Sequence, residues 1–167
     1  MSAIANDHIG IRVTDMERSV RFYVEAFAAK PLTRPFLISG ELPEAMFEGL
    51  PGVSFRLCHL GFGEGMIELF EFQHPRRGAA LIEGWRGNIT HVGFVVEDVE
   101  ATVGRVLAAG GTQVFATRSW GVNHLAYTRD PDGNVIEIAD APLSGLLVGT
   151  IAQFPEADPS AHVREQG

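Results

Sequence analysis

Cysteine, lysine and long apolar runs are almost absent from this chain of 167 residues. The single cysteine, Cys58, cannot form a disulfide bond within the chain, which fits a reducing compartment. No apolar run approaches the roughly 20 residues that a membrane-spanning helix needs. The first ten residues, MSAIANDHIG, lack the basic region and apolar run of a secretory signal. We therefore expect a cytoplasmic protein with no membrane partner.

Positive charge is also scarce, and this narrows the classes of partner. The chain has 13 Lys and Arg against 21 Asp and Glu, which gives a formal net charge of −8, and its basic residues form no stripe. We therefore expect no nucleic-acid partner. The hydrophobic fraction of 46% is that of a globular protein, and the length suffices for one buried domain or for two small fused units.

The first part of the chain is repeated in the second. Residues 8–20 read HIGIRVTDMERSV and residues 91–103 read HVGFVVEDVEATV, and without gaps the two segments share His, Gly, Val, Asp, Glu and Val. A second pair of segments follows in the same order, MIEL at 66–69 and VIEI at 135–138. Two matches in the same order indicate that the chain arose by duplication of one unit.

Each unit has the pattern of one strand, one helix and three further strands. Apolar and polar residues alternate from His8 to Val13, which is typical of a strand covered on one face. Asp15 and, in the second unit, Asp98 stand at N-cap positions before segments with helical apolar spacing. The pattern predicts an α+β protein of two βαβββ modules. The expected divisions are a first module at 1–73 with an insertion at 40–52, a linker at 74–90, a second module at 91–140 and a C-terminal extension at 141–167 whose end is disordered.

The alternation also predicts where four polar side chains point. If the apolar residues of each strand face the helices, the opposite, concave side of the sheet receives His8, Glu68, His91 and Glu137. A lone histidine or glutamate in a strand is usually structural, but here both recur at matching places in the two units. A divalent cation would offset the cost of placing carboxylates among apolar neighbours. The sequence therefore predicts one metal site, whose two nitrogen and two oxygen ligands suit Zn²⁺, Ni²⁺, Co²⁺, Mn²⁺ or Fe²⁺ better than Ca²⁺.

Four segments resemble the vicinal oxygen chelate superfamily, which includes glyoxalase I, methylmalonyl-CoA epimerase, extradiol dioxygenases and proteins of bleomycin or fosfomycin resistance. They are HIGIRVTDMERSVRFYVEAF, MIELFEF, ITHVGFVVEDVEATVGRVLAAGG and YTRDPDGNVIEIAD, and they cover both modules. The resemblance implies the glyoxalase-like fold, an open, cup-shaped mixed β-sheet built from tandem βαβββ modules around a metal. It also implies that His8 and Glu68 are the ligands of the first module, and His91 and Glu137 those of the second.

The presence of Glu68 favours one branch of this superfamily. Extradiol dioxygenases bind iron with two histidines and one glutamate, whereas four ligands resemble the glyoxalase I and epimerase branch, although epimerases often carry Gln at this place. The resemblance implies a metal-dependent lyase or isomerase that abstracts a proton next to a carbonyl or enediolate of a small-molecule substrate. An Fe(II)-dependent extradiol-type dioxygenase is the alternative, and a non-catalytic small-molecule-binding or resistance protein is the second alternative.

Within this branch, Glu137 is the expected base, because Tyr127 should lie across a hairpin from it and orient it. Glu68 is the other metal carboxylate able to take a proton, and Glu48 on the insertion is a further candidate. Relatives commonly form homodimers, so a homodimer is expected, and the apolar stretch at 143–154 could cover either a partner or the chain's own sheet.

Several further side chains are candidates for the rim of the site. Arg12 and Arg56 are predicted to share the concave face and to bind a substrate carboxylate or phosphate, although a solvated charge at a strand edge explains each equally well. Trp120 is expected to border the cavity, and Cys58 could face it. The predicted register turns His59 away from the site.

Overall fold

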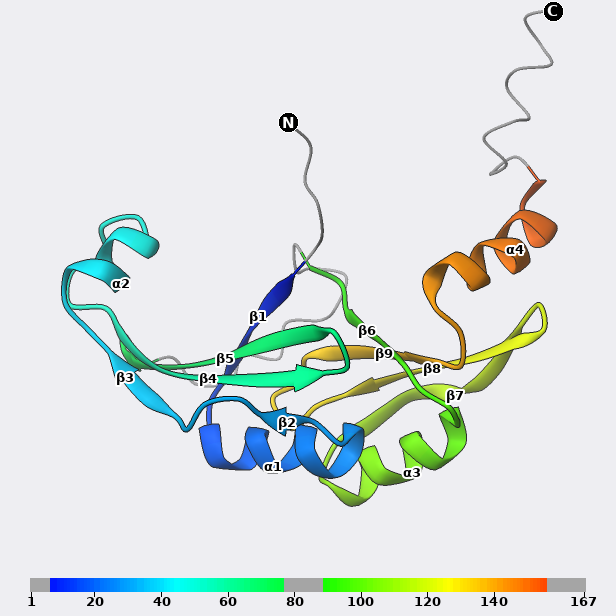
Figure 1. Ribbon diagram of the computed structural model, residues 1–167, viewed down its shortest axis with the longest axis horizontal. Coiled ribbons are helices and arrows are strands. Elements are labelled where there is room, and N and C mark those ends of the chain that lie inside the picture. Colours follow the sequence, from blue (N-terminus) through cyan, green and yellow to red (C-terminus); the bar gives the residue numbers. More distant parts are fainter. Residues whose placement is uncertain (1–6, 77–88, 156–167) are drawn as a thin grey trace, which may run out of the picture.

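The computed structural model describes residues 7–76 and 89–155. Within these ranges the chain forms two α+β modules, each with its own open sheet (Figure 1). Most of the predicted linker and the end of the C-terminal extension lie outside the described residues. No helix in the described part of the chain is long and apolar enough to cross a membrane.

The first module follows the predicted order of elements. They are β1 (His8–Val13), α1 (Met16–Phe27), β2 (Lys30–Pro31), β3 (Phe36–Ile38), α2 (Glu41–Met46), β4 (Ser54–Phe62) and β5 (Gly65–His74). The sheet has the order β1-β5-β4-β2, and β3 also pairs with β4. β1 runs parallel to β5, while the other pairs are antiparallel. The strands β2 and β3 are the shortest of this sheet.

The second module repeats this arrangement. Its elements are β6 (Val92–Val95), α3 (Val99–Ala108), β7 (Thr112–Trp120), β8 (Asn123–Arg129) and β9 (Val135–Ala139), and the helix α4 (Leu143–Gln153) follows. The sheet order is β6-β9-β8-β7, with β6 parallel to β9 and the other pairs antiparallel. The structure confirms the predicted α+β class with open mixed sheets. In the described residues the strands form two separate sheets, not one continuous cup.

The helices α1 and α3 begin at the predicted caps. The side chain of Asp15 accepts a hydrogen bond from the backbone N–H of Arg18, and that of Asp98 accepts one from the N–H of Ala101, each at 2.9 Å. Such caps satisfy N–H groups that have no partner inside the helix, and each one stabilises the protein by about 1 kcal/mol. The duplicated aspartates therefore have the same local role in both modules.

The helices α1 and α3 lie side by side and cover the same side of the two sheets (Figure 1). Their apolar faces and the helix-facing residues of the strands form one core that both modules share. Its fully buried members include Met16, Tyr23, Leu69, Val106 and Ile136. Because helices fill this side, the strand residues of opposite parity are left on the other, open face of each sheet.

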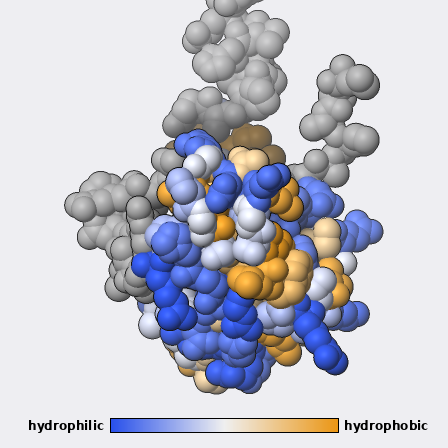
Figure 2. Space-filling model, turned by 90° about the vertical axis from the view of Figure 1, so that its left-hand side faces the viewer, coloured by the Kyte–Doolittle hydropathy of each residue, from blue (hydrophilic) through white to orange (hydrophobic). Residues whose placement is uncertain are grey.

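The insertion at 40–52 contains the short helix α2. Phe47, directly after α2, packs edge-on against Phe55 and Phe72 of the sheet, with ring centroids 5.6 and 5.1 Å apart. Figure 2 shows this end of the molecule, where apolar side chains gather among charged ones. The exposed apolar residues of α2 and β3 are Phe36, Leu37, Leu42 and Met46. Phe47 therefore anchors a helix whose own apolar residues stay largely at the surface.

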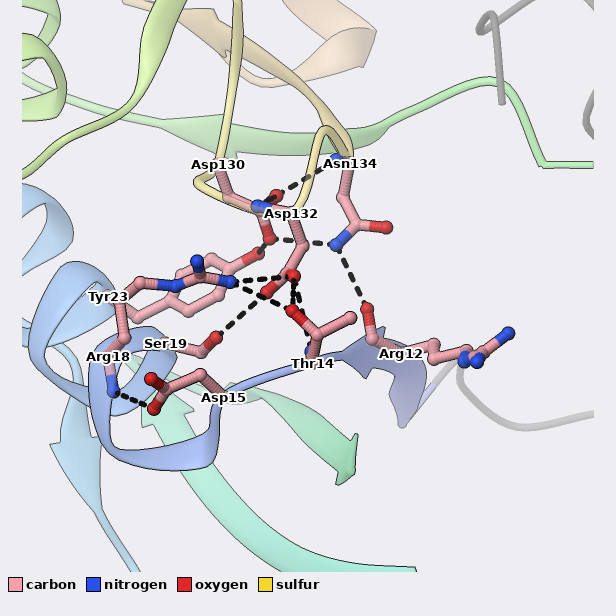
Figure 3. A network of polar contacts seen from close by, with 9 residues as sticks. All are labelled: Arg12, Thr14, Asp15, Arg18, Ser19, Tyr23, Asp130, Asp132 and Asn134. Atoms are coloured by element: carbon pink, nitrogen blue, oxygen red, sulfur yellow. Dashed lines mark hydrogen bonds and ion pairs between the residues drawn. The ribbon is translucent and has the colours of Figure 1, made fainter. Parts of the chain in front are cut away.

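A polar network joins the β8–β9 turn of the second module to α1 of the first (Figure 3). The carboxylate of Asp132 accepts hydrogen bonds from the backbone N–H and hydroxyl of Thr14. It also accepts bonds from the Arg18 guanidinium at 2.7 Å and from the Ser19 hydroxyl at 3.2 Å. The Asp132 side chain is only 4% exposed, so these donors largely replace water. Asp132 therefore fixes the second module to the first turn of α1.

Asp130 anchors the same turn. Its carboxylate accepts hydrogen bonds from the buried Tyr23 hydroxyl at 3.1 Å and from the backbone and side-chain N–H groups of Asn134, both at 2.8 Å. The Asn134 side chain also donates to the Arg12 carbonyl on β1 at 3.1 Å. Burial raises the pKa of Asp130, and the hydrogen bonds from Asn134 oppose that rise. The turn–helix network consists of Thr14, Arg18, Ser19, Tyr23, Asp130, Asp132 and Asn134.

Candidate metal centre

The first His–Glu pair lies on neighbouring strands of the first sheet. His8 begins β1, and the parallel pairing sets Gly10 opposite Glu68 of β5. Nε2 of His8 is 3.5 Å from Oε2 of Glu68. Gly10 places no side chain beside the carboxylate, so His8 reaches it from two residues earlier on the same face. A hydrogen bond that Nδ1 donates to the Asp7 carboxylate and the charge of Glu68 raise the pKa of His8.

The second module repeats this geometry. His91 directly precedes β6, and the parallel pairing sets Gly93 opposite Glu137 of β9. Nε2 of His91 is 2.8 Å from Oε2 of Glu137, and its Nδ1 is 3.0 Å from the Thr90 hydroxyl. Both side chains are half-buried. The duplication that the sequence shows therefore extends to the register and the contact of the two pairs.

Each glutamate also has a polar partner directly opposite on the neighbouring antiparallel strand. In the second module this partner is Tyr127, whose hydroxyl donates to Oε2 of Glu137 at 3.0 Å, across the hairpin that the sequence indicates. In the first module it is His59, whose Nε2 is 3.1 Å from Oε1 of Glu68. Burial and the charge of Glu137 raise the pKa of Tyr127 to about 12, so the phenol keeps its proton at neutral pH.

The prediction that His59 points away from the site is wrong. A two-residue turn, Gly63–Glu64, joins β4 to β5, so that Phe62 pairs with Gly65 and His59 with Glu68. The turn region is rich in glycine and is compatible with more than one register, and a shift of one residue moves every side chain to the other face. The two-residue turn could have indicated that His59 faces Glu68, because the residue pairs of β4 and β5 can be counted back from it.

The same register corrects two further predictions. Arg56 and Cys58 lie on the helix-facing side of β4, not on the site face. The Arg56 guanidinium forms ion pairs with Glu17 of α1 and with Glu71 of β5, the second at 3.0 Å. Arg56 therefore joins α1 to the sheet. Cys58 is fully buried in the core, and burial raises the pKa of its thiol, which opposes reactivity.

Arg12 lies on the site face of β1, where the alternation predicts it, with its guanidinium carbon 5.5 Å from the centre of the Phe72 ring. Trp120, at the end of β7, contacts the C-terminal helix instead of standing alone. Its indole N–H donates to Thr150 of α4 at 3.2 Å, and its ring packs against Phe154. The C-terminal helix thus contacts the end of β7 through Trp120, and the role of Trp120 at the cavity stays a prediction.

The two pairs have the donor chemistry of a divalent-metal site. Two imidazoles and two carboxylates form a set that suits first-row divalent ions. Ligands bound to one ion at about 2.1 Å lie about 3 to 3.5 Å apart, and the His–Glu distances of 3.5 and 2.8 Å lie close to this range. In the described ranges, however, no three His, Cys, Asp or Glu side chains converge closely enough to hold an ion. The residues therefore fit a metal once the two pairs are brought together.

The fold and the site define a class: a duplicated βαβββ protein with one His–Glu pair on the open face of each module. Comparison with known families gives that class a name, because residues 6–138 match the Glyoxalase/Bleomycin resistance protein/Dioxygenase superfamily. The chain belongs to this superfamily.

Individual relatives are consistent with this membership. The chain is 30% identical over 135 residues to a probable lactoylglutathione lyase of Vibrio cholerae, covering 78% of this chain and 86% of the relative. It is 27% identical over 138 residues to a protein of the same name from Vibrio parahaemolyticus, with the same coverage. A solved glyoxalase family protein from Bacillus cereus is 21% identical, covers 83% of this chain and 95% of its own, and has a TM-score of 0.73. At that identity the structural likeness shows the fold.

Proposed function

We propose that the protein is a metal-dependent lyase or isomerase of the glyoxalase type, which abstracts a proton next to a carbonyl of a small-molecule substrate. The observation that carries this proposal is the repetition of one His–Glu pair, in one register, in both modules. The relatives named lactoylglutathione lyase support a lyase. Glu68 favours this chemistry over a dioxygenase, whose iron site needs one carboxylate.

The metal would be held by His8, Glu68, His91 and Glu137, with Zn²⁺, Ni²⁺, Co²⁺, Mn²⁺ and Fe²⁺ as candidates. When bound, it supplies positive charge that stabilises the negative charge developing on the substrate as a carbon acid loses its proton. Arg12, on the same face of β1 as His8, would bind an acidic group of the substrate. The chain itself must supply the base.

Glu137 is the base in this proposal. Its Oε2 atom takes both protein contacts, from His91 at 2.8 Å and from Tyr127 at 3.0 Å. Oε1 is thereby left without a hydrogen bond to any residue in the described part of the chain, and it can accept a proton. In Glu68, by contrast, both oxygens have partners, one in His8 and the other in His59. Tyr127 would hold Glu137 at the angle required for proton transfer.

We further propose that the four ligands assemble between two copies of the chain. His8 and His91 stand at β1 and β6, and each of these strands is the end strand of its sheet in the described ranges. A groove of about 710 Å³ lies between β6 and the first module, with Val92–Val96 on one side and Ile9, Phe27 and the β4–β5 turn at Phe62–Ile67 on the other. Val95 is 60% exposed there. A second copy bound at these edges would place the His8–Glu68 pair of one chain beside the His91–Glu137 pair of the other.

This assembly predicts complementation between two inactive variants. His8→Ala and His91→Ala should each lose metal binding and turnover as purified homodimers. Mixing them allows heterodimers in which one site carries both substitutions and the other carries none. With random exchange, activity and bound metal should return to about a quarter of the wild-type level. If the ligands instead meet within one chain, no activity returns on mixing, although size-exclusion profiles show exchange.

The function is tested with metal-loaded protein and lactoylglutathione, the compound in the name of the relatives. We expect turnover that is lost on chelation and returns when Zn²⁺, Ni²⁺ or Co²⁺ is added back. Exchange of the proton next to the carbonyl in D₂O, followed by NMR, reports proton abstraction directly. Consumption of O₂ with a catechol would support the dioxygenase instead. A protein that binds none of these ions, at any concentration at which it dimerises, would contradict the proposal.

A further inference from the structure

The residue paired with the metal-site glutamate differs between the two modules. Glu137 faces a tyrosine, whereas Glu68 faces an imidazole at the same register position of the duplicated hairpin. We propose that His59 is a positioning residue, an inference that rests on the proposed metal site. His59 fixes the carboxylate of Glu68, so that Glu68 acts as a permanent ligand while Glu137 acts as the base.

The hydrogen bonds around His59 favour one tautomer of its ring. The backbone N–H of His59 donates to the Thr33 hydroxyl oxygen at 3.0 Å, so the hydroxyl proton is available to donate to Nδ1, which is 3.1 Å away. In the neutral ring, Nε2 then carries the proton and donates to Oε1 of Glu68 at 3.1 Å. Thr33 thus selects the tautomer that Glu68 requires, in the way that outer-shell partners orient metal-binding side chains.

An aromatic ring holds the donor in place in both modules. The Phe36 ring stacks on His59 with centroids 6.1 Å apart and an interplanar angle of 26°, and Phe115 stacks on Tyr127 at 5.2 Å and 29°. Each aromatic residue comes from the strand on the outer side of the donor strand. Side chains of the same kinds therefore follow one another across both sheets, in the order aromatic ring, hydrogen-bond donor, carboxylate and histidine. The fold therefore fixes the position of the His59 ring, and a polar residue of another shape would not fill it in the same way.

His59 and Tyr127 differ in which oxygen of their glutamate they contact. His59 and His8 contact opposite oxygens of Glu68, so rotation of this carboxylate breaks one contact or the other. Tyr127 and His91 contact the same oxygen of Glu137, so its second oxygen stays available. His59 consequently makes Glu68 the less mobile of the two carboxylates. Loss of His59 should weaken metal binding without removing a ligand.

The test compares the metal affinity of the full-length protein with that of three variants. His59→Ala removes the donor, His59→Gln retains an N–H group near the position of Nε2, and His124→Ala is the matched control. His124 is also a strand histidine bonded to a carboxylate, that of Asp140 at 2.9 Å, but it lies on β8 away from Glu68. Co²⁺ affinity is measured by competition with a chromophoric chelator, and the visible spectrum of the Co²⁺ protein reports the ligand set.

We expect His59→Ala to bind Co²⁺ about 10- to 100-fold more weakly than wild type, with an unchanged number of nitrogen ligands in its spectrum. His59→Gln should recover most of the affinity, and His124→Ala should match wild type. Equal affinities of His59→Ala and wild type would overturn the role of His59. A spectrum of His59→Ala that lacks one imidazole would also overturn it, because His59 would then be a ligand itself. Wild-type protein that binds no Co²⁺ would refute the proposed function instead, so the two failures are distinguishable.

Discussion

Replacing Glu137 by glutamine should lower turnover by about 10²- to 10⁴-fold at saturating metal, the range that a general base contributes. Glutamine has the same size and can still accept the Tyr127 hydrogen bond, but a neutral amide cannot take a proton from carbon. The far-UV circular dichroism and the thermal unfolding of Glu137→Gln should match wild type. Steady-state kinetics over a range of metal concentrations separates loss of the base from loss of the ligand.

Two companion variants make the result specific. Tyr127→Phe keeps the ring but loses the hydroxyl that orients Glu137, and it should cost about 10-fold, within the range for positioning groups near a metal. Because the pKa of Tyr127 is about 12, its ionisation should not appear in the pH–rate profile near neutrality. Glu25→Gln, on the exposed face of α1, should have no effect. Full activity of Glu137→Gln, or a larger loss in Glu68→Gln at saturating metal, would show that the base is assigned to the wrong residue.

Replacing Asp132 by alanine should lower the free energy of unfolding by about 2–4 kcal/mol. The variant loses a charge-assisted hydrogen bond from Arg18, and it also loses the bonds from Thr14 and Ser19. Hydrogen bonds to a charged group contribute about 1.5–3 kcal/mol each, and the partly exposed Arg18 can recover part of this by hydration. Urea unfolding followed by far-UV circular dichroism measures the difference.

Asp98→Ala serves as the comparison for Asp132→Ala. Like Asp132, Asp98 accepts a hydrogen bond from the first turn of a helix, but this bond lies within the second module and caps α3. Its loss should cost about 1 kcal/mol, the usual contribution of one N-cap. Asp132→Asn keeps the shape but not the charge and should fall between the two. If Asp132→Ala unfolds at the same urea concentration as Asp98→Ala, the turn–helix network contributes no more than a cap does.

Much of the fold follows from the sequence because duplication repeats each signal twice. Asp15 and Asp98 cap the two helices as predicted, and the alternation in β1 and β9 sets the directions of His8 and Glu137. A period of two residues fixes which side chains share a face within one strand. That is why the His–Glu pairs could be predicted from spacing alone.

The register between strands could not be predicted in the same way. The prediction for Arg56, Cys58 and His59 depended on where a glycine-rich turn closes, and glycine tolerates several turn geometries. The helix α4 was also missed, because its mostly apolar residues lack the polar face that identifies an amphipathic helix. How the two pairs approach each other depends on tertiary or quaternary packing, which no local pattern encodes.

The turn–helix network also bears on the order in which the chain is made. Its hydrogen bonds between the two modules join residues 107 to 118 positions apart, so α1 leaves the ribosome long before the turn that completes its contacts. Until the β8–β9 turn emerges, the Tyr23 hydroxyl and the side chains of Arg18 and Ser19 lack these carboxylate partners. Contacts between distant segments must await loop closure, which slows folding. Although the two modules are copies of one unit, the first can therefore complete these contacts only after the second has been synthesised.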